Sequence, residues 1–428
     1  MGSCVSIATK KKPIATSVKF EFPDHGGFFT KESPVFVARA PGRLDVMGGI
    51  ADYSGSLVAE MPIGQAALCG AQVDPSGKLT IRSLNIGRTV SVATGGEKET
   101  ERWAVYLAGC VALLKAEGLL SPHAGVRLLL TSDVPLGAGV SSSAAIEVAT
   151  MRAVTAAFEI ALDGLTLARL CQRVENEWVG APCGVMDQVT SACGEEGKLL
   201  LLRCQPHTIE GYTQIPAGWS VFGVDSCVKH SVGGTGYTGV RCAAFMGAKL
   251  LGLRPTDYLC NLTPTHYKAL GITLPETLSG AAFLEQHGPT WDTVTRVDPA
   301  QHYPVLSATE HPIFENQRVE TFLAALGAGD FALAGKQMLA AHASYSRCGL
   351  GTKETDLLVA LAMDQSGVAG AKITGGGSGG TVCILCPSER EAAVAESVAE
   401  AYEKHTGTPP RLIHGTSPGA LATPVGSL

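Results

Sequence analysis

Charged residues and long apolar runs are scarce in this chain of 428 residues. Only 17% of the residues are charged and the formal net charge is -6, so the sequence lacks the basic excess that nonspecific nucleic-acid binding requires. No run of eighteen apolar residues occurs, which argues against a membrane-spanning helix. With 45% hydrophobic residues, the chain can nevertheless bury the cores of two domains.

Cysteine is present in an odd number, thirteen, spread along the chain. No secretory signal peptide is recognisable, so we expect reduced thiols and a cytoplasmic location. Cys383 and Cys386 have CxxC spacing, but they lie in an apolar, strand-like run without a second pair at zinc spacing. We therefore interpret them as core residues.

The N-terminus matches a lipidation pattern. Gly2 is followed by Ser6 at the spacing typical of N-myristoylation, and Cys4 could accept a palmitoyl group. One acyl chain binds a membrane only marginally, so stable attachment would need the second chain or the basic cluster Lys10–Lys12. Two interpretations stay open for residues 1–30: a peripheral membrane anchor and a flexible tail that matches by chance.

Three separated segments at residues 41–45, 135–143 and 374–380 each place a flexible, amide-rich loop beside an apolar run. The middle loop follows a strand-like segment at 126–130 and precedes a helix-forming segment at 144–157. Its backbone amides and the helix dipole can therefore converge on a phosphate, and its serines can cap the helix. No Gly-Lys-Ser or Gly-Lys-Thr follows it, which excludes a Walker A motif.

Local patterns predict further elements. Residues 35–38 and 44–47 are expected to form two short strands, and residues 165–179 an amphipathic helix. Ser388 and Glu391 predict a capping box before the last helix.

Together with two more segments, these loops resemble the signatures of the GHMP small-molecule kinases. Residues 43–48 and 52–55 are similar to the sugar-binding signature of galactokinases, and residues 183–188 to their catalytic-aspartate segment. The resemblance covers about residues 35–385. It implies an α+β fold of two domains with the active site between them. The N-terminal domain, 31–212, would resemble ribosomal protein S5 domain 2, and the C-terminal domain, 213–428, would be ferredoxin-like. Residues 253–312 are expected to form a long insertion with little regular structure.

One departure from the galactokinase signature concerns the sugar. Galactokinases carry Glu-His where this chain has Gly49 and Ile50, and in that family the Glu holds the 6-hydroxyl of galactose. L-Arabinopyranose lacks the hydroxymethyl group, and an unpaired buried carboxylate would be unfavourable in its pocket. The substitution thus favours arabinose, and residues 47–55 also resemble the kinase part of plant-type L-arabinokinases.

The resemblance implies transfer of phosphate from ATP to the C1 hydroxyl of L-arabinose, with Mg2+ as the second cofactor. A galactokinase and a catalytically silent sugar sensor are the alternatives, and the oligomeric state stays open. Asp187 would be the base, and Arg43 would keep it ionised and stabilise the transferring group. Magnesium would bind Ser142 and Glu175. The implied phosphate ligands are Gly137, Ala138, Gly139, Val140, Ser141, Ser142, Ser143, Gly376 and Gly377, and the implied sugar ligands are Asp45, Gly49, Ile50, Asp52, Gly184, Asp187 and Tyr237.

Overall fold

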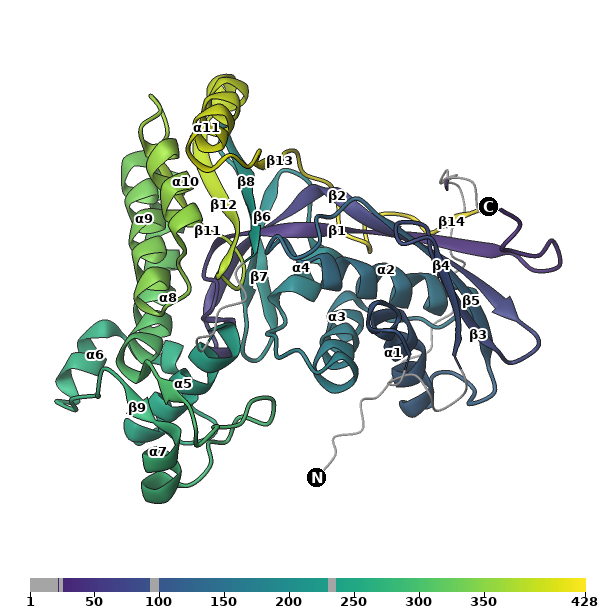
Figure 1. Ribbon diagram of the computed structural model, residues 1–428, viewed down its shortest axis with the longest axis horizontal. Coiled ribbons are helices and arrows are strands. Elements are labelled where there is room, and N and C mark those ends of the chain that lie inside the picture. The colour runs from purple at the N-terminus through teal and green to yellow at the C-terminus, as the bar shows by residue number, and fades with distance from the viewer. Residues whose placement is uncertain (1–21, 23–25, 93–99, 230–235) are drawn as a thin grey trace.

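The structure is a computed structural model that describes residues 22, 26–92, 100–229 and 236–428. Two helix-covered sheets lie next to each other (Figure 1). Gly2, Cys4 and Lys10–Lys12 lie outside the described residues, so both interpretations of the N-terminus stay predictions. Within the described ranges, none of the helices combines the length and apolar character needed to cross a bilayer.

The first sheet has eight strands around the long antiparallel pair β1 and β2. The path β14-β1-β2-β5-β3-β4 is extended by β6, which pairs with β2 and with β7. Helices α1 to α4 cover one face (Figure 1). The strands are β1 (Val35–Met47), β2 (Leu57–Asp74), β3 (Leu79–Ser83), β4 (Arg88–Val92), β5 (Gly125–Ser132), β6 (Lys198–Arg203), β7 (Thr208–Gln214) and β14 (Gly426–Ser427), and the helices are α1 (Arg102–Ala116), α2 (Ser142–Ala157), α3 (Gly164–Arg173) and α4 (Met186–Cys193).

The two short strands expected at 35–38 and 44–47 are one continuous strand, β1. Its register against β2 shifts between Pro41 and Arg43 and again between Asp45 and Met47. Such bulges re-aim side chains without ending a strand, and here they fall at the first loop signature. The helix expected at 165–179 is α3 followed by a π-helical turn, Val174–Val179.

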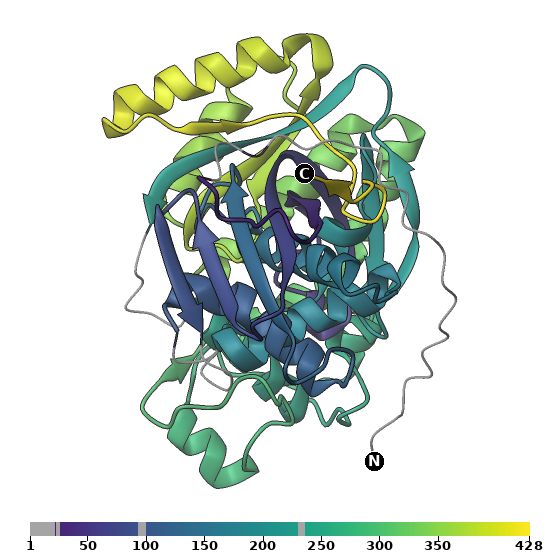
Figure 2. The ribbon, with the colours of Figure 1, turned by 90° about the vertical axis from the view of Figure 1, so that its right-hand side faces the viewer.

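The second sheet has the order β11-β12-β8-β13, and α9, α10 and α11 pack against it. The inner strand β12 is mostly apolar, and its side chains pack into two different core clusters on either side of the sheet. The chain returns from α11 to the first sheet, where β14 pairs with β1 (Figure 2). The bounds are β8 (Trp219–Lys229), β11 (Gly370–Ile373), β12 (Gly379–Pro387), β13 (Arg411–Ile413), α5 (Gly236–Leu250), α8 (Val305–Ala328), α9 (Phe331–Arg347), α10 (Lys353–Met363) and α11 (Glu391–Thr406).

We propose that the domain boundary lies at residues 215–218, because β7 still belongs to the first sheet and β8 begins the second. The predicted capping box at Ser388 is wrong. Residues 388–390 form a short 3-10 turn, and the Ser388 hydroxyl bonds that of Ser220 instead. The capping box that forms is that of Thr352 and Thr355 at α10.

The insertion at 253–312 is more regular than its composition suggested. It contains α6 (Pro264–Ala269), α7 (Gly280–His287), the short strands β9 (Leu278–Ser279) and β10 (His302–Tyr303), and the start of α8. Pro264 is compatible with α6 because it lies in the first turn, where a backbone N–H has no partner within the helix. Thr263 caps this helix, since its hydroxyl accepts from the His266 amide at 3.1 Å.

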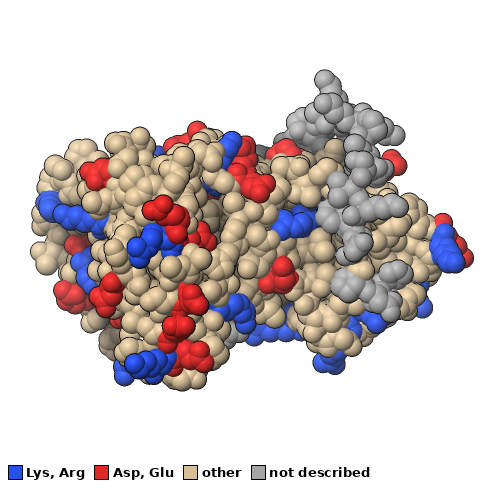
Figure 3. Space-filling model, turned by 90° about the horizontal axis from the view of Figure 1, so that it is seen from above, with Lys and Arg blue, Asp and Glu red and all other residues tan. Residues whose placement is uncertain are grey.

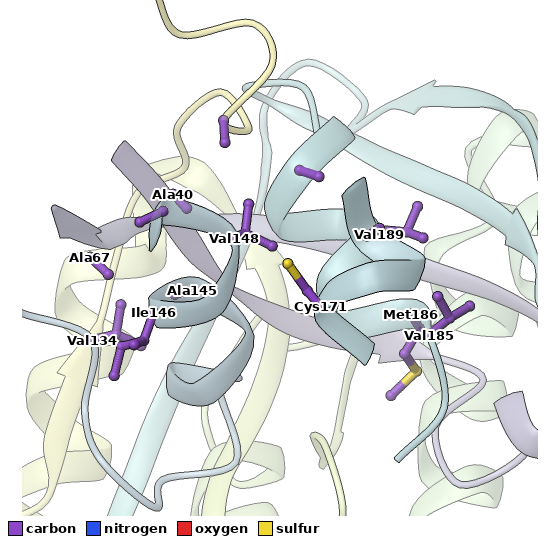
Figure 4. Packing of buried hydrophobic residues seen from close by; sticks show 14 of the residues in the cluster. Ala40, Ala67, Val134, Ala145, Ile146, Val148, Cys171, Val185, Met186 and Val189 are labelled. Carbon is purple, nitrogen blue, oxygen red and sulfur yellow. The ribbon is translucent and has the colours of Figure 1, made fainter. Parts of the chain in front are cut away.

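One apolar core joins α2, α3 and α4 to the first sheet and continues into the second. Figure 4 shows Val148 of α2, Cys171 of α3 and Val189 of α4 within it. The twelve cysteines that the structure describes are all free, and Cys383 and Cys386 are buried in β12 as expected. On the face seen in Figure 3, lysine and arginine are interspersed with aspartate and glutamate.

Candidate active site

Arg43 is the centre of a buried ion-pair cluster between β1, β2 and the start of α4. Its Nε and Nη2 donate to Asp187 Oδ1 at 3.0 and 2.8 Å, and Nε lies 3.1 Å from Glu60 Oε2. Burial lowers the pKa of Arg43, but the charges of Asp187 and Glu60 outweigh this and raise it. Asp187 keeps 21% of its side chain exposed, whereas Glu60 keeps none. Asp187 is therefore the carboxylate that a substrate can reach.

The same arginine reaches the middle glycine-rich loop. Arg43 Nη1 donates to Gly139 O at 2.8 Å, and the Arg43 amide donates to Val140 O at 3.1 Å. Ser141, just before α2, has a left-handed backbone, and its hydroxyl makes no capping bond. The predicted capping therefore does not occur at Ser141, and the first amides of α2 remain available to an anion.

The third glycine-rich loop lies against the middle one. Gly375 and Gly380 of this loop lie against Gly139 and Ala138, and the amide and hydroxyl of Thr381, directly after the loop, donate to Ala138 O at 3.0 and 2.8 Å. Gly376 Cα lies beside the Tyr237 ring, which in turn meets the Tyr53 ring edge-on at a centroid distance of 5.8 Å. The structure therefore brings together the two predicted phosphate-binding loops and one predicted sugar ligand.

Two buried glutamates lie behind the middle loop. The Gln188 amide donates to Glu175 Oε2 at 2.8 Å and to Glu147 Oε2 at 3.3 Å. Burial, followed by the charge of Asp187, raises the pKa of Glu175 to about 7, although a bond from the Ser143 hydroxyl opposes the shift. Ser143, which directly follows the predicted metal ligand Ser142, therefore lies near Glu175, and the role of Ser142 stays a prediction. Glu147 was not predicted from the sequence. The one sign of its role was that it is the single acidic residue in a helix made mostly of small and apolar residues.

These residues fit a magnesium ion that is also bound by phosphates. Among the described residues, no group of three or more His, Cys, Asp or Glu side chains could hold a metal alone. Mg2+ in nucleotide sites typically takes one or two carboxylates and completes its shell with phosphate oxygens and water. A cation at Glu175 and the serines that begin α2 would also offset the repulsion between Glu147 and Glu175.

Asp52 and Gly184 are in direct contact. A Cβ atom at Gly184 would overlap the Asp52 carboxylate, so only glycine fits there. Asp52 is buried, and its Oδ1 has no hydrogen-bond partner among the described residues. Burial and the charge of Asp187 raise the pKa of Asp52 to about 6, while Arg241 opposes them. Asp52 and Gly184 line a pocket of about 200 Å3 that also contains Arg241 and insertion residues 291–294.

Asp45 is not among the residues that line this pocket. Its Oδ2 accepts from Lys372 Nζ at 2.9 Å and from Tyr345 OH at 3.1 Å, and its Oδ1 accepts from the Gly49 amide at 3.1 Å. Lys372 and Asp45 have no exposed side-chain surface. Because the Asp45 carboxylate has no exposed surface and already bonds residues of both domains, we propose that it belongs to the contact between the domains. Sequence reasoning missed Lys372 and Tyr345.

Gly49 and Ile50 face this contact as well. A Cβ atom at Gly49 would overlap Asp45 Oδ2 and Tyr345 OH, and Gly49 O accepts from His311 Nε2 at 3.0 Å. Ile50 has a positive φ of 52°, uncommon for a β-branched residue, and is buried with Tyr53 and Tyr345. The position that carries Glu in galactokinases is thus closed by other side chains.

Comparison with known proteins shows the family of this chain. Residues 105–195 match the GHMP kinases N terminal domain, and residues 322–404 match the GHMP kinases C terminal family. The L-arabinokinase of Arabidopsis thaliana is 37% identical over 92% of this chain, which spans 47% of that protein, about half its length. A galactokinase of Streptomyces coelicolor is 33% identical over 86% of this chain and 89% of its own length. The structure of Lactococcus lactis galactokinase complexed with galactose superposes with a TM-score of 0.76 at 23% identity, covering 93% of this chain and 95% of that one. The predicted family and two-domain fold are confirmed, and the chain belongs to the GHMP kinases, among the sugar kinases related to galactokinase.

Proposed function

We propose that this protein is an ATP-dependent sugar kinase that phosphorylates the anomeric C1 hydroxyl of L-arabinose. One observation carries the proposal: Arg43 contacts both Asp187 and Gly139 O. A single guanidinium thereby connects the accessible carboxylate to the loop that precedes the N-terminus of α2. A hydroxyl at Asp187 would thus lie close to a triphosphate bound by that loop, and in-line phosphoryl transfer requires the two to be close.

In the proposed reaction, the β and γ phosphates of ATP lie on the amides of loop 137–143. The C1 oxygen forms a bond to the γ phosphorus, the bond from that phosphorus to the bridging oxygen breaks, and ADP leaves. Asp187 would accept the C1 proton, because it is the carboxylate beside Arg43 that keeps exposed surface. Arg43 also stabilises the negative charge on the transferring group. Ser142, Ser143 and Glu175 would hold Mg2+, which supplies charge neutralisation at the phosphates when bound.

The choice of L-arabinose over D-galactose is supported by the closed position at Gly49 and by the L-arabinokinase relative. A carboxylate at position 49 has no room beside Asp45 and Tyr345, so none is available there for a 6-hydroxyl. The galactokinase relative, matched over most of its length, keeps galactokinase as the alternative. A pocket that only lacks a polar partner rejects an added hydroxyl by about 100-fold, so discrimination should be measurable but incomplete.

The test is steady-state turnover of both sugars by the purified protein with ATP and magnesium. We expect a higher kcat/KM for L-arabinose and a phosphate on C1 of the product, identified by its NMR coupling to phosphorus. Equal or better turnover of D-galactose would refute the arabinose assignment. Asp187→Asn should lower kcat by about 10²- to 10⁴-fold and leave ATP binding intact. A wild-type protein that binds sugar without turning it over would be a sensor instead.

We also propose a cytoplasmic protein with N-terminal acylation at Gly2 and Cys4. The free cysteines support the proposed cytoplasmic location. The acylation is supported by the N-terminal sequence pattern alone. Intact-mass analysis of the protein from its native cell tests the second point. An unmodified Gly2 or a retained Met1 would rule out myristoylation.

A further inference from the structure

An ion pair joins the insertion to the pocket that holds Asp52 and Gly184. Arg241 Nε and Nη2 donate to Asp292 Oδ2 and Oδ1, both at 2.9 Å. Arg241 belongs to α5, and Asp292 lies in the segment between α7 and β10. The two side chains are only 7% and 3% exposed, and both residues line the pocket. A planar, two-bond contact of this kind fixes the orientation of the guanidinium.

Asp292 is itself held rigidly. Besides Arg241, its carboxylate accepts from the Thr295 hydroxyl at 2.6 Å and from the amides of Val294 and Thr295 at 3.1 and 3.2 Å. Burial raises the pKa of Asp292, but the bonds from Arg241 and Thr295 outweigh this and lower it. The segment therefore presents an ionised carboxylate at a defined position.

Arg241 in turn contacts residues next to the predicted sugar ligands Asp52 and Gly184. Its Nη1 donates to Cys183 O at 3.2 Å, directly before Gly184, and its guanidinium lies 5.5 Å from the centre of the Tyr53 ring. Gly184 Cα packs on the Asp52 carboxylate, and Tyr53 follows Asp52 in the chain. Arg241 thus contacts the Cys183 backbone on one side of the Asp52–Gly184 contact and the Tyr53 ring on the other, while Asp52 Oδ1 remains without a partner among the described residues.

We propose that Asp292 is a positioning residue for the acceptor sugar. It locks Arg241 in place, and Arg241 holds the Cys183–Gly184 backbone and the Tyr53 ring, so that Asp52 and Gly184 face the sugar hydroxyls. The inference rests on the proposed sugar kinase function for its substrate. It assigns a role to the insertion: the segment at 288–301 completes the sugar site from outside the two glycine-rich loops.

The test compares Asp292→Asn with Asp298→Asn. Asp298 is an exposed acid on the same segment and serves as the matched control. Asp292→Asn removes the charge that fixes Arg241, so the Cys183–Gly184 backbone and the Tyr53 ring should be held less firmly. The KM for sugar should therefore rise by on the order of tenfold. The KM for ATP should stay within about twofold of wild type. Asp292→Glu keeps the charge and should recover part of the sugar KM, which a merely structural role for the residue would not require.

Several outcomes would overturn the inference. A sugar KM within twofold of wild type in Asp292→Asn would do so, and so would an equal rise in the KM for ATP, which indicates general loss of structure. Should Asp292→Asn fail to fold, Arg241→Lys, which loses the planar two-bond contact with Asp292, carries the same comparison.

Titration calorimetry with L-arabinose and D-galactose separates this inference from the proposed function. A wild-type protein that binds either sugar but transfers no phosphate refutes the function alone, and the calorimetric affinities of the variants then decide the role of Asp292. Binding of neither sugar overturns both.

Discussion

Replacing Arg43 by methionine removes the cation that contacts both Glu60 and Asp187. Glu60 has no exposed side-chain surface, so water cannot take the place of the guanidinium. Breaking a buried ion pair by removing one partner typically destabilises a protein by about 3–5 kcal/mol. Glu60 can limit the loss by binding a proton, because burial and then the charge of Asp45 already raise its pKa. We therefore expect the free energy of unfolding to fall by about 3 kcal/mol at neutral pH.

The loss should depend on pH in a defined direction. In the variant, folded Glu60 keeps a proton that the unfolded chain releases above its ordinary pKa of about 4.3. The folded state then binds more protons than the unfolded state, so its stability falls as the pH rises. Urea unfolding followed by tryptophan fluorescence at pH 5.5, 7 and 8.5 measures this slope, with the wild-type protein as reference.

A second substitution separates stability from catalysis. Arg43→Met with Glu60→Gln removes the orphaned charge, so it should flatten the added pH slope and recover about 1–2 kcal/mol. Turnover should stay lost in both variants, because Asp187 and the transferring phosphate still lack Arg43. An Arg43→Met variant with wild-type urea resistance, or a double variant with an unchanged slope, would refute the reasoning.

Two further predictions concern the surroundings of this site. Gly49→Ala should lower the free energy of unfolding by about 1–3 kcal/mol or more, because the added Cβ overlaps Asp45 and Tyr345. The control is Gly327→Ala in α8, where the added Cβ meets nothing within 4 Å, so this substitution should be neutral or stabilising. Equal urea midpoints for the two would contradict the closed position at Gly49. Burial and then the charge of Asp187 raise the pKa of Glu175 to about 7, so the folded state keeps a proton that the unfolded chain releases at lower pH. The free energy of unfolding of the metal-free protein should therefore fall by up to about 3 kcal/mol as the pH rises from 5 to 8. Glu175→Gln should reduce that slope, and an unchanged urea titration across this range would exclude Glu175 as its source.

The elements that the sequence predicted correctly were those determined by residues close to one another in the chain. The strand-loop-helix order at 126–157 follows from an apolar strand, loop glycines that permit positive φ, and a helix-forming segment without glycine or proline. Arg43 and Asp187 were found through their signatures, although 144 residues separate them.

Only the tertiary structure decided which charged residues are buried and what they contact. A lysine is usually exposed, and nothing beside Lys372 in the sequence indicates that it pairs with Asp45, 327 residues away. Asp292 likewise lies in a segment whose composition suggested an irregular surface excursion, yet it pairs with Arg241 of α5. The physical reason is the same in both cases. A charge can stay buried only if a partner arrives from elsewhere in the fold, and that partner is set by how the two domains and the insertion pack together.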